Sequence, residues 1–283
     1  MKTRVFYGLT WGSLAILTAF FAYSPLMGVL ISIFAVGAAH EIQKVAGVKN
    51  LPILITSHLF AFALPLVVEY DLLKRFGIPL MPIIVIYFIL LMCFMLQGYE
   101  KTKFEHVAVS FVASVFVPYA LSCFMLVRDL FKVYPESIDR LQALYLFLLA
   151  IVCSWMTDAY AYFVGSKLGK RKMSPKISPK KSIEGAVGGV VCTLILNLVA
   201  LYFFNKFFLI RPIPFYFVIP ASVLLSIIGM LGDLSASAVK RNYGVKDFGT
   251  FMKGHGGVMD RFDSCIFVFP AFYATITLAK VFI

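Results

Sequence analysis

The sequence predicts an all-α, polytopic integral membrane protein with about nine transmembrane helices. Three observations predict this fold: 61% of the 283 residues are hydrophobic, only 14% are charged, and the mean hydropathy is +0.90. A soluble domain of this length has too little interior to bury so much apolar surface. The charged residues also cluster, and the apolar stretches between the clusters are about 20 residues long, the length of a helix that crosses a bilayer.

The apolar stretches are taken in order as candidate spans. They cover residues 5–22, 25–40, 51–70, 77–97, 107–127, 141–165, 185–209, 212–232 and 264–283. The first two are short, and one tilted or re-entrant hairpin is an open alternative for them. Lys2 and Arg4 precede the first stretch as in a signal peptide, but no small-residue cleavage site stands out, so we expect an uncleaved helix.

Basic residues concentrate in two segments, 166–184 and 233–263, which two spans separate and which therefore share one side. The positive-inside rule makes that side cytoplasmic. We expect a multi-pass protein of the cell (inner) membrane with its active site on the cytoplasmic side. The net charge of +12 then reflects basic loops, contact with anionic membrane lipids and a polyanionic substrate rather than nucleic acid, since no long soluble basic face exists.

No internal repeat or low-complexity linker divides the chain. We therefore expect residues 1–283 to form a single membrane domain. Its N-terminal helical array would cover residues 1–140. The charged segments that carry chemistry belong to a second half, residues 141–283, which we expect to be the catalytic one.

A carboxylate stands at the end of the eighth apolar stretch, at Asp233. Such a group is costly at the end of a span unless it is paired or functional. Asp233 and Lys240 are seven residues apart, so they share a face if the helix continues between them. Taken alone, a helix-capping aspartate beside ordinary interfacial basic residues is an equally good interpretation.

The next charged segment carries Asp260 and Asp263, which a helix places on one face because they are three residues apart. Together with Asp233 they form a set of oxygen ligands suited to Mg²⁺. Gly256 and Gly257 precede them and leave backbone N–H groups open to phosphate oxygens. These features predict a metal and triphosphate site. The alternative is a charged loop whose ion pairs satisfy one another.

Basic side chains for phosphate accompany these carboxylates. They are Lys240, Arg241 and Arg261, which offer point charges and bidentate forks. Asp158 lies well inside the sixth stretch, where an ionisable residue is a functional hypothesis by default. It is followed by Lys180, Lys181 and Ser182, which we expect to bind phosphates beside it. The wider basic run, residues 167–176, is interpreted as setting the membrane topology and attracting anionic lipid.

The remaining histidines and one glutamate are interpreted as structural. His40 and Glu41 end the second stretch, and a buried pair or an interfacial cap is favoured there over a catalytic role. His58 and His106 are interpreted as packing or interfacial residues.

At these residues the sequence resembles the CDP-diacylglycerol synthases, also called phosphatidate cytidylyltransferases. The family signature reads S-x-x-K-R, four residues, K-D, and later H-G-G-x-x-D-R-x-D. The matching residues here are Ser237, Lys240, Arg241, Lys246, Asp247, His255, Gly256, Gly257, Asp260, Arg261 and Asp263. The similarity covers about residues 150–265, and the N-terminal half is similar only in its general plan of apolar helices.

The resemblance implies that CTP and phosphatidate react to give CDP-diacylglycerol and pyrophosphate. It implies Mg²⁺ held by Asp233, Asp260 and Asp263, with a second, monovalent cation such as K⁺ left open. Lys246, Asp247 and His255 would organise the loop. The resemblance also implies a homodimer, and we expect this oligomeric state here.

Two positions depart from the family pattern. Lys253 stands where the family usually has proline, and Ala236 stands where many bacterial members carry glutamate. Proline would fix the backbone before the glycines, and lysine leaves it freer. Neither departure touches a predicted metal ligand, so we expect an active enzyme whose metal affinity differs from that of its relatives.

Two rival functions remain open on the sequence. A CTP-dependent lipid kinase would attack the γ-phosphorus and release CDP. The near-complete signature at residues 255–263 argues against it. A transporter or ion channel would use the intramembrane Asp158, but such proteins often have repeated halves, which this sequence lacks.

Overall fold

The structure is a computed structural model, and it describes residues 22–208, 210–249 and 256–278. In the described part, seven helices are long and apolar enough to cross a membrane, and one further apolar helix is shorter. The predicted all-α polytopic class is confirmed. Eight of the nine predicted spans have a helix as counterpart, and the first, residues 5–22, lies outside the described residues.

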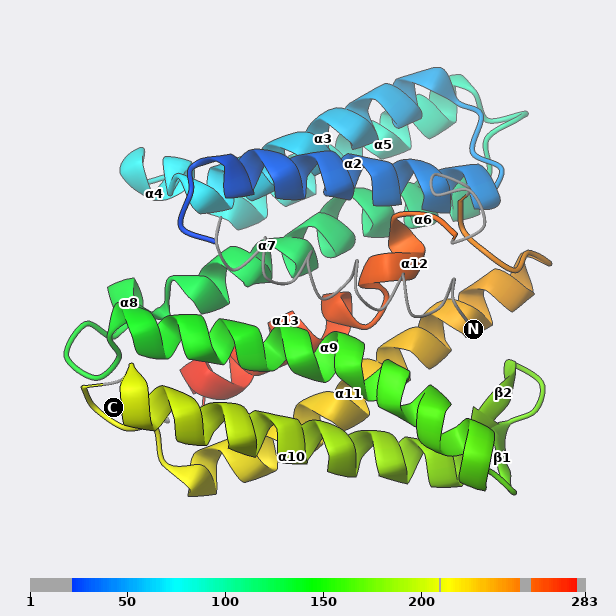
Figure 1. Cartoon of the computed structure of the whole chain (residues 1–283). Coiled ribbons are helices and arrows are strands. Elements are labelled where there is room, and N and C mark those ends of the chain that lie inside the picture. Colours follow the sequence, from blue (N-terminus) through cyan, green and yellow to red (C-terminus); the bar gives the residue numbers. More distant parts are fainter. Residues whose placement is uncertain (1–21, 209, 250–255, 279–283) are drawn as a thin grey trace.

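The elements follow one another along the chain as a series of helices with one small β-hairpin (Figure 1). They are α2 (Leu26–Val45), α3 (Leu51–Glu69), α4 (Leu72–Arg75), α5 (Leu80–Gln97), α6 (Phe104–Phe111), the π-helical turn η1 (Val112–Phe116), α7 (Val117–Arg128), α8 (Leu130–Val133), α9 (Arg140–Leu168), β1 (Lys172–Ser174), β2 (Ser178–Ser182), α10 (Ile183–Phe207), α11 (Phe215–Asn242), α12 (Met259–Phe262) and α13 (Cys265–Leu278).

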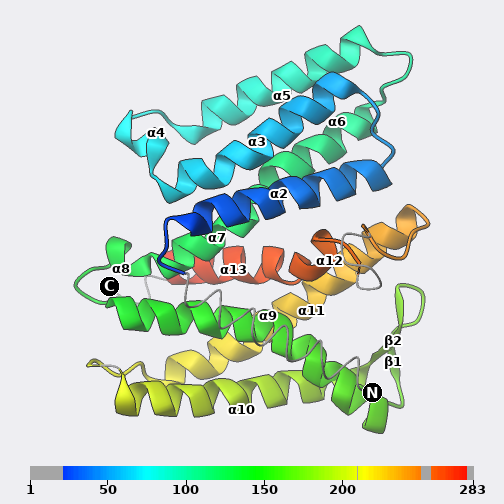
Figure 2. The same cartoon turned by 45° about the horizontal axis from the view of Figure 1, so that its top comes forward.

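The long helices run roughly side by side in layers, with α2, α3 and α5 in one layer and α9 and α10 in another (Figures 1 and 2). Between them lie α7 and α13, which pack against each other, while α11 crosses obliquely to contact both α10 and α13. The hairpin, the C-terminal end of α11 and α12 gather at one end of the array (Figure 1). The two basic segments therefore share one end of the molecule, as the sequence predicts.

The helix α11 continues ten residues beyond the predicted span 212–232, so the predicted loop 233–263 begins as helix. Residues 233–242 contain neither glycine nor proline, and nothing interrupts the hydrogen-bond ladder there. The helix ends where Gly244 adopts a φ of +68° and the Val245 N–H donates to the carbonyl of Lys240 at 2.9 Å. This extension carries Asp233 and Lys240 on one helix, as their spacing indicates.

The predicted loop 166–184 contains the antiparallel hairpin, which the sequence analysis did not foresee. Lys172 pairs with Ser182, and Ser174 pairs with Ser178, with an irregularity in register between them. The strands are only three and five residues long and lack an apolar alternation, so the pattern that normally predicts strands is absent. The hairpin places two lysines, Lys180 and Lys181, at the end of the helix array.

Glycines bring α9 and α10 into close contact. A Cβ atom added at Gly189 would lie 2.7 Å from the carbonyl oxygen of Thr157, and one added at Gly185 would lie 2.6 Å from that of Ala161. These obstacles are backbone atoms, which cannot rotate away. Small residues at such crossings let two membrane helices approach, and here they fix the stretch of α9 that contains Asp158.

Replacement of Gly189 by valine is therefore expected to force α9 and α10 apart and to destabilise the protein. Overpacking of a close contact costs about 1–3 kcal/mol. A thermal melt of the detergent-solubilised protein measures this, with Val191→Ala on the exposed face of α10 as the control. An unchanged melting temperature for Gly189→Val would show that the contact is not tight.

The far end of the array is held by a buried arginine. Arg128 at the end of α7 pairs with Glu69 at 2.9 Å and with Asp129 at 2.7 Å, and it donates to the carbonyl of Ala22 at 2.7 Å. Its side chain is 3% exposed, so these partners replace the water that the guanidinium lacks. This cluster ties α3 and α7 together at the end away from the hairpin (Figure 1).

Candidate active site

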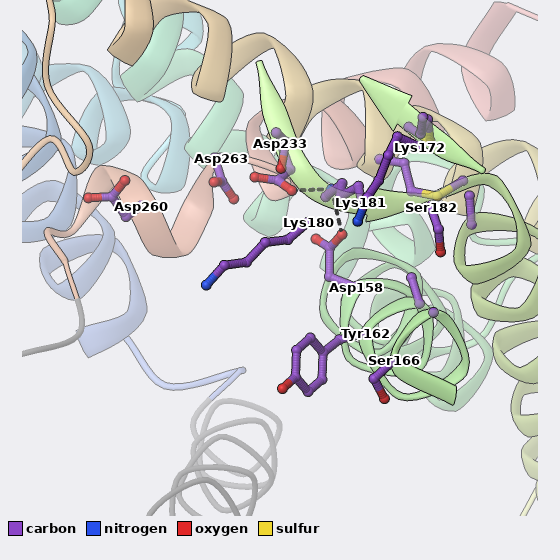
Figure 3. Close-up of a pocket in the computed structure, with 16 residues that line it drawn as sticks. Asp158, Tyr162, Ser166, Lys172, Lys180, Lys181, Ser182, Asp233, Asp260 and Asp263 are labelled. Carbon is purple, nitrogen blue, oxygen red and sulfur yellow. Dashed lines mark hydrogen bonds and ion pairs between the residues drawn. The ribbon is translucent and has the colours of Figure 1, made fainter. Parts of the chain in front are cut away.

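A cavity of about 620 Å³ opens between the hairpin, α9 and α11 (Figure 3). Its polar lining comes from five elements or their ends, and the residues are Asp158, Tyr162 and Ser166 of α9, Lys172, Ser178, Lys180, Lys181 and Ser182 of the hairpin, Asp233 of α11, Asp260 of α12, and Asp263. Asp260, Asp263 and Asp233 follow one another along one side, and Asp158 faces them from α9 (Figure 3). Four of the five predicted acidic site residues therefore reach the same cavity, and Asp247 does not.

Lys181 lies between two of these carboxylates. Its ammonium group pairs with Asp158 at 3.1 Å and also contacts Asp233 (Figure 3). Burial works to lower the pKa of Lys181, but the charges of Asp158 and Asp233 outweigh it and raise that pKa overall. The lysine is therefore charged, and it joins β2 to α9 and α11.

Among the described residues, Asp260 has three hydrogen-bond partners. Its Oδ1 accepts a hydrogen bond from Lys240 Nζ at 2.6 Å, and its Oδ2 accepts from the N–H groups of Phe248 at 2.8 Å and Gly257 at 2.9 Å. Gly256 has a φ of +81°, and a Cβ there would lie 2.9 Å from Oδ2 of Asp260. Gly256 and Gly257 therefore pack closely against the carboxylate of Asp260, and the N–H of Gly257 donates to it.

Asp263 has a different environment. It is 9% exposed, its Oδ1 accepts the N–H of Ser264 at 2.8 Å, and it forms no ion pair among the described residues. Burial raises the pKa of Asp263 well above its usual range, and the neighbouring charges of Asp233 and Asp158 raise it further, against the influence of Lys240. Asp263 is therefore the carboxylate of the cavity whose negative charge is least compensated.

These side chains fit a divalent cation by their chemistry. Carboxylate oxygens are the ligands that Mg²⁺ prefers, and four aspartates line the cavity. Lys181 pairs with Asp158 and Asp233, and Lys240 pairs with Asp260. In the described part of the chain, no three Asp, Glu, His or Cys side chains converge closely enough to hold a metal ion as they stand. The lysines instead occupy positions against Asp233 and Asp260.

The cavity also includes residues that the sequence analysis did not select. Tyr162 and Ser166 follow Asp158 at intervals of four, which places all three on one face of α9. That spacing is the signal from which they were predictable. Lys172 belongs to the run assigned to topology, but it lines the cavity because the hairpin turns it there. Ser264 donates to Asp158 Oδ2 at 3.1 Å.

Ser182 has a structural contact at the start of α10. It is the N-cap residue, and its hydroxyl accepts the N–H of Gly185 at 3.1 Å. Ser182→Ala is expected to lower the free energy of unfolding by about 1 kcal/mol, the usual cost of losing an N-cap. A melt of the purified variant measures this, and Ser182→Thr, which keeps the hydroxyl, serves as the comparison. Equal stability of the alanine variant would contradict the capping role.

Several residues of the matched signature lie outside the main cavity. Arg241 is exposed, and it donates to the carbonyls of Val245 at 2.9 Å and Ile177 at 3.4 Å, which joins α11 to the hairpin turn. Lys246 and Asp247 are exposed and do not line the cavity. His255 lies outside the described residues, as does Lys253.

A second, smaller cavity of about 210 Å³ lies beside the first and shares Asp158, Asp260 and Asp263 with it. Arg261 and Trp155 line it, and the Trp155 indole N–H donates to the carbonyl of Arg261 at 3.3 Å. The carboxylates therefore face two spaces, one lined by lysines and one lined in part by apolar side chains of α9.

Comparison with known proteins agrees with the motif. The chain matches the cytidylyltransferase family over residues 2–279. It is 35% identical over 285 residues to a phosphatidate cytidylyltransferase of Bacillus subtilis (strain 168), covering 98% of each chain. It is 38% identical over 133 residues to proteins of the same name from Staphylococcus haemolyticus and Staphylococcus aureus, covering 46% of this chain and 48% of theirs.

Proposed function

Because this chain belongs to the cytidylyltransferase family, we propose that it transfers CMP from CTP to phosphatidate, giving CDP-diacylglycerol and pyrophosphate. The resemblance predicted from residues 237–263 is confirmed by the whole-chain match. The observation that carries the proposal is the cavity in which four aspartates meet hairpin lysines at one end of a bundle of membrane helices. A phosphate transfer between a nucleotide and a lipid needs these features together.

The reaction joins two anions. A phosphate oxygen of phosphatidate forms a bond to the α-phosphorus of CTP, and the bond from that phosphorus to the bridging oxygen breaks, so pyrophosphate leaves. Phosphatidate is already a competent nucleophile near pH 7, because the second pKa of a phosphomonoester is about 6. The protein therefore needs no general base, and its task is to position the reactants and to neutralise charge.

A divalent metal ion belongs to the chemistry of this family, and we assign Mg²⁺ to Asp233, Asp260 and Asp263. When bound, it supplies positive charge to the phosphates of CTP and to the departing pyrophosphate. Asp158 and Lys181 fix the position of Asp233, while Lys240 and the N–H of Gly257 fix that of Asp260. We retain a second, monovalent cation such as K⁺ as a proposal, which metal analysis of the purified protein tests.

We assign the triphosphate to the larger cavity, where Lys172, Lys180 and Lys181 line the wall. The phosphate of phosphatidate is assigned to the smaller cavity, where Arg261 lies beside the shared carboxylates. Its acyl chains would remain in the bilayer along α9, and CTP would enter from water. The two substrates would then meet across Asp158 and Asp263.

The basic end of the array favours a cytoplasmic active site in the inner membrane, because positively charged loops face the cytoplasm. Cysteine labelling from either side of sealed vesicles, with a cysteine introduced at exposed Lys176, tests this orientation. We retain the homodimer as a proposal, and the mass of the purified protein in detergent decides it.

The reaction itself is tested with the purified protein in phosphatidate-containing liposomes, Mg²⁺ and CTP. Label in the α-phosphate should enter the lipid, and unlabelled pyrophosphate should appear in equal amount. A lipid kinase would instead transfer label from the γ-phosphate and release CDP. Solute flux without CTP turnover would favour a transporter and remove the proposed function.

A further inference from the structure

A glutamate from the N-terminal helix array reaches into the catalytic half. Glu41 lies near the C-terminal end of α2 and is 7% exposed. Its Oε1 accepts the N–H of Val258 at 2.9 Å, and its Oε2 accepts the N–H of Met259 at 2.9 Å. These partners are more than 200 residues away in the chain and directly precede Asp260. The contact therefore links two halves of the protein at the segment that carries Asp260 and Asp263, the carboxylates that we assign to the metal.

The carboxylate of Glu41 occupies a space that two glycines leave open. A Cβ atom added at Gly249 or at Gly257 would fall on this carboxylate. Gly249 has no positive φ, so the lack of a side chain there is needed for space rather than for backbone conformation. The glycines, one on each side of the segment 250–255, thus form a socket for a side chain of α2.

Apolar contacts support the same junction. A Cβ at Gly37 would lie 3.2 Å from Cγ2 of Val258, so α2 already touches this residue closely. The rings of Phe34 and Phe262 have centroids 5.2 Å apart. Since α12 is only four residues long, its own hydrogen bonds cannot fix its direction. Its position depends on these contacts and on the carboxylates that accept its N–H groups.

Three consecutive N–H groups are divided between two carboxylates. Gly257 donates to Asp260, while Val258 and Met259 donate to Glu41. We propose that Glu41 is a positioning residue, which fixes the backbone of residues 257–259 so that Asp260 and Asp263 present their oxygens to the metal and to CTP. This inference rests on the proposed function. Glu41 does not line either cavity, so it acts through the aspartates.

The geometry explains why the residue is glutamate. Each oxygen accepts one N–H, so a glutamine has one acceptor for two donors, and its NH₂ group faces the other N–H. An aspartate is shorter by one methylene and cannot reach both partners from the same helix. Loss of a supporting partner behind a metal ligand typically lowers metal affinity by about 10–100-fold.

The test compares Glu41→Gln and Gly249→Ala with the parent enzyme. In Gly249→Ala the glutamate remains, but the new methyl group displaces its carboxylate at no cost in backbone strain. Both variants are expected to need about tenfold more Mg²⁺ for half-maximal rate and to have a lower kcat. Hydrogen exchange at Val258 and Met259 should accelerate by about tenfold, since each loses a bond to a charged acceptor.

Glu69→Gln is the matched control, because it removes a buried carboxylate that pairs with Arg128 at the far end of the array. It should lower the melting temperature and leave the Mg²⁺ requirement and kcat of the folded enzyme unchanged. If both test variants keep the parent Mg²⁺ requirement, or lose stability without any kinetic change, Glu41 is only structural and the inference is wrong. Failure of the parent enzyme to make CDP-diacylglycerol would instead remove the proposed function.

Discussion

Asp263→Asn is expected to abolish CDP-diacylglycerol synthesis while the protein keeps its fold. The substitution preserves the size of the side chain and its acceptor for the Ser264 N–H, but it removes the charge that we assign to Mg²⁺. Loss of one electrostatic contact to the transition state typically costs about 10²–10³-fold in kcat, and loss of a metal ligand should cost at least as much. Release of pyrophosphate from CTP in phosphatidate liposomes measures the effect.

The same variant should be as stable as the parent or more stable in metal-free buffer. Asp263 is buried beside Asp233 and Asp158, and burial together with these like charges raises its pKa, so its ionised form is unfavourable in the folded protein. A neutral amide removes that cost. A melting temperature several degrees below that of the parent would mean that Asp263 has a structural role, and unimpaired synthesis would remove it from the metal site.

Asp139→Asn provides the control for the loss of one negative charge. Asp139 is the N-cap of α9 at the end of the array away from the hairpin, and its carboxylate accepts the N–H of Gln142 at 2.8 Å. Asparagine is an equally good N-cap, so this variant should keep both stability and activity. A comparable loss of activity in Asp139→Asn would show that the assay responds to net charge rather than to the site.

The sequence was sufficient to predict the acidic residues of the cavity, because each of them violates a simple expectation. Asp158 is a charge inside an apolar stretch, Asp233 ends another, and the pair Asp260 and Asp263 follows glycines at helical spacing. Such residues are costly in a membrane protein unless they have a function. The helices were predictable for a different reason, because the length and the hydropathy of a stretch are enough to define a membrane span.

Other features depend on contacts between distant parts of the chain, which one sequence does not reveal. Lys172 belongs to a run interpreted as topogenic, and only the pairing of β1 with β2 brings it to the cavity that Asp158 also lines. Glu41 was interpreted as part of a buried pair with His40 or as an interfacial cap. It is buried, but its partners are Val258 and Met259 at the opposite end of the chain. The N–H of Gly257, expected to face phosphate, donates to Asp260 instead.

Lys181→Met is expected to lower kcat/KM for CTP by about 10²-fold or more, the effect of removing one preorganised charge contact. In the described part of the chain, Lys181 is the cation that contacts both Asp158 and Asp233, and it also lines the cavity assigned to the triphosphate. Methionine keeps the length of the side chain but not its charge. Lys181→Arg should retain part of the activity because it keeps the charge in a larger group.

The loss of Lys181 should also change how Mg²⁺ affects stability. Without the lysine, Asp158 and Asp233 are left unpaired in a partly buried site, at a cost of roughly 1–3 kcal/mol, below that of breaking a fully buried pair. A cation that binds only the folded protein restores stability in proportion to its affinity and concentration. Added Mg²⁺ should therefore raise the melting temperature of Lys181→Met more than that of the parent.

Lys132→Met is the control for this experiment. Lys132 also pairs with an aspartate, Asp129, at 2.7 Å, but it is 57% exposed and lies at the other end of the array. An exposed pair contributes at most about 1 kcal/mol, so this variant should change neither the kinetics nor the response to Mg²⁺. Equal stabilisation of parent and Lys181→Met by Mg²⁺ would mean that the metal binds away from Asp158 and Asp233. In that case the lysine holds these aspartates together for structural reasons, and Asp260 and Asp263 must bind the metal without Asp233.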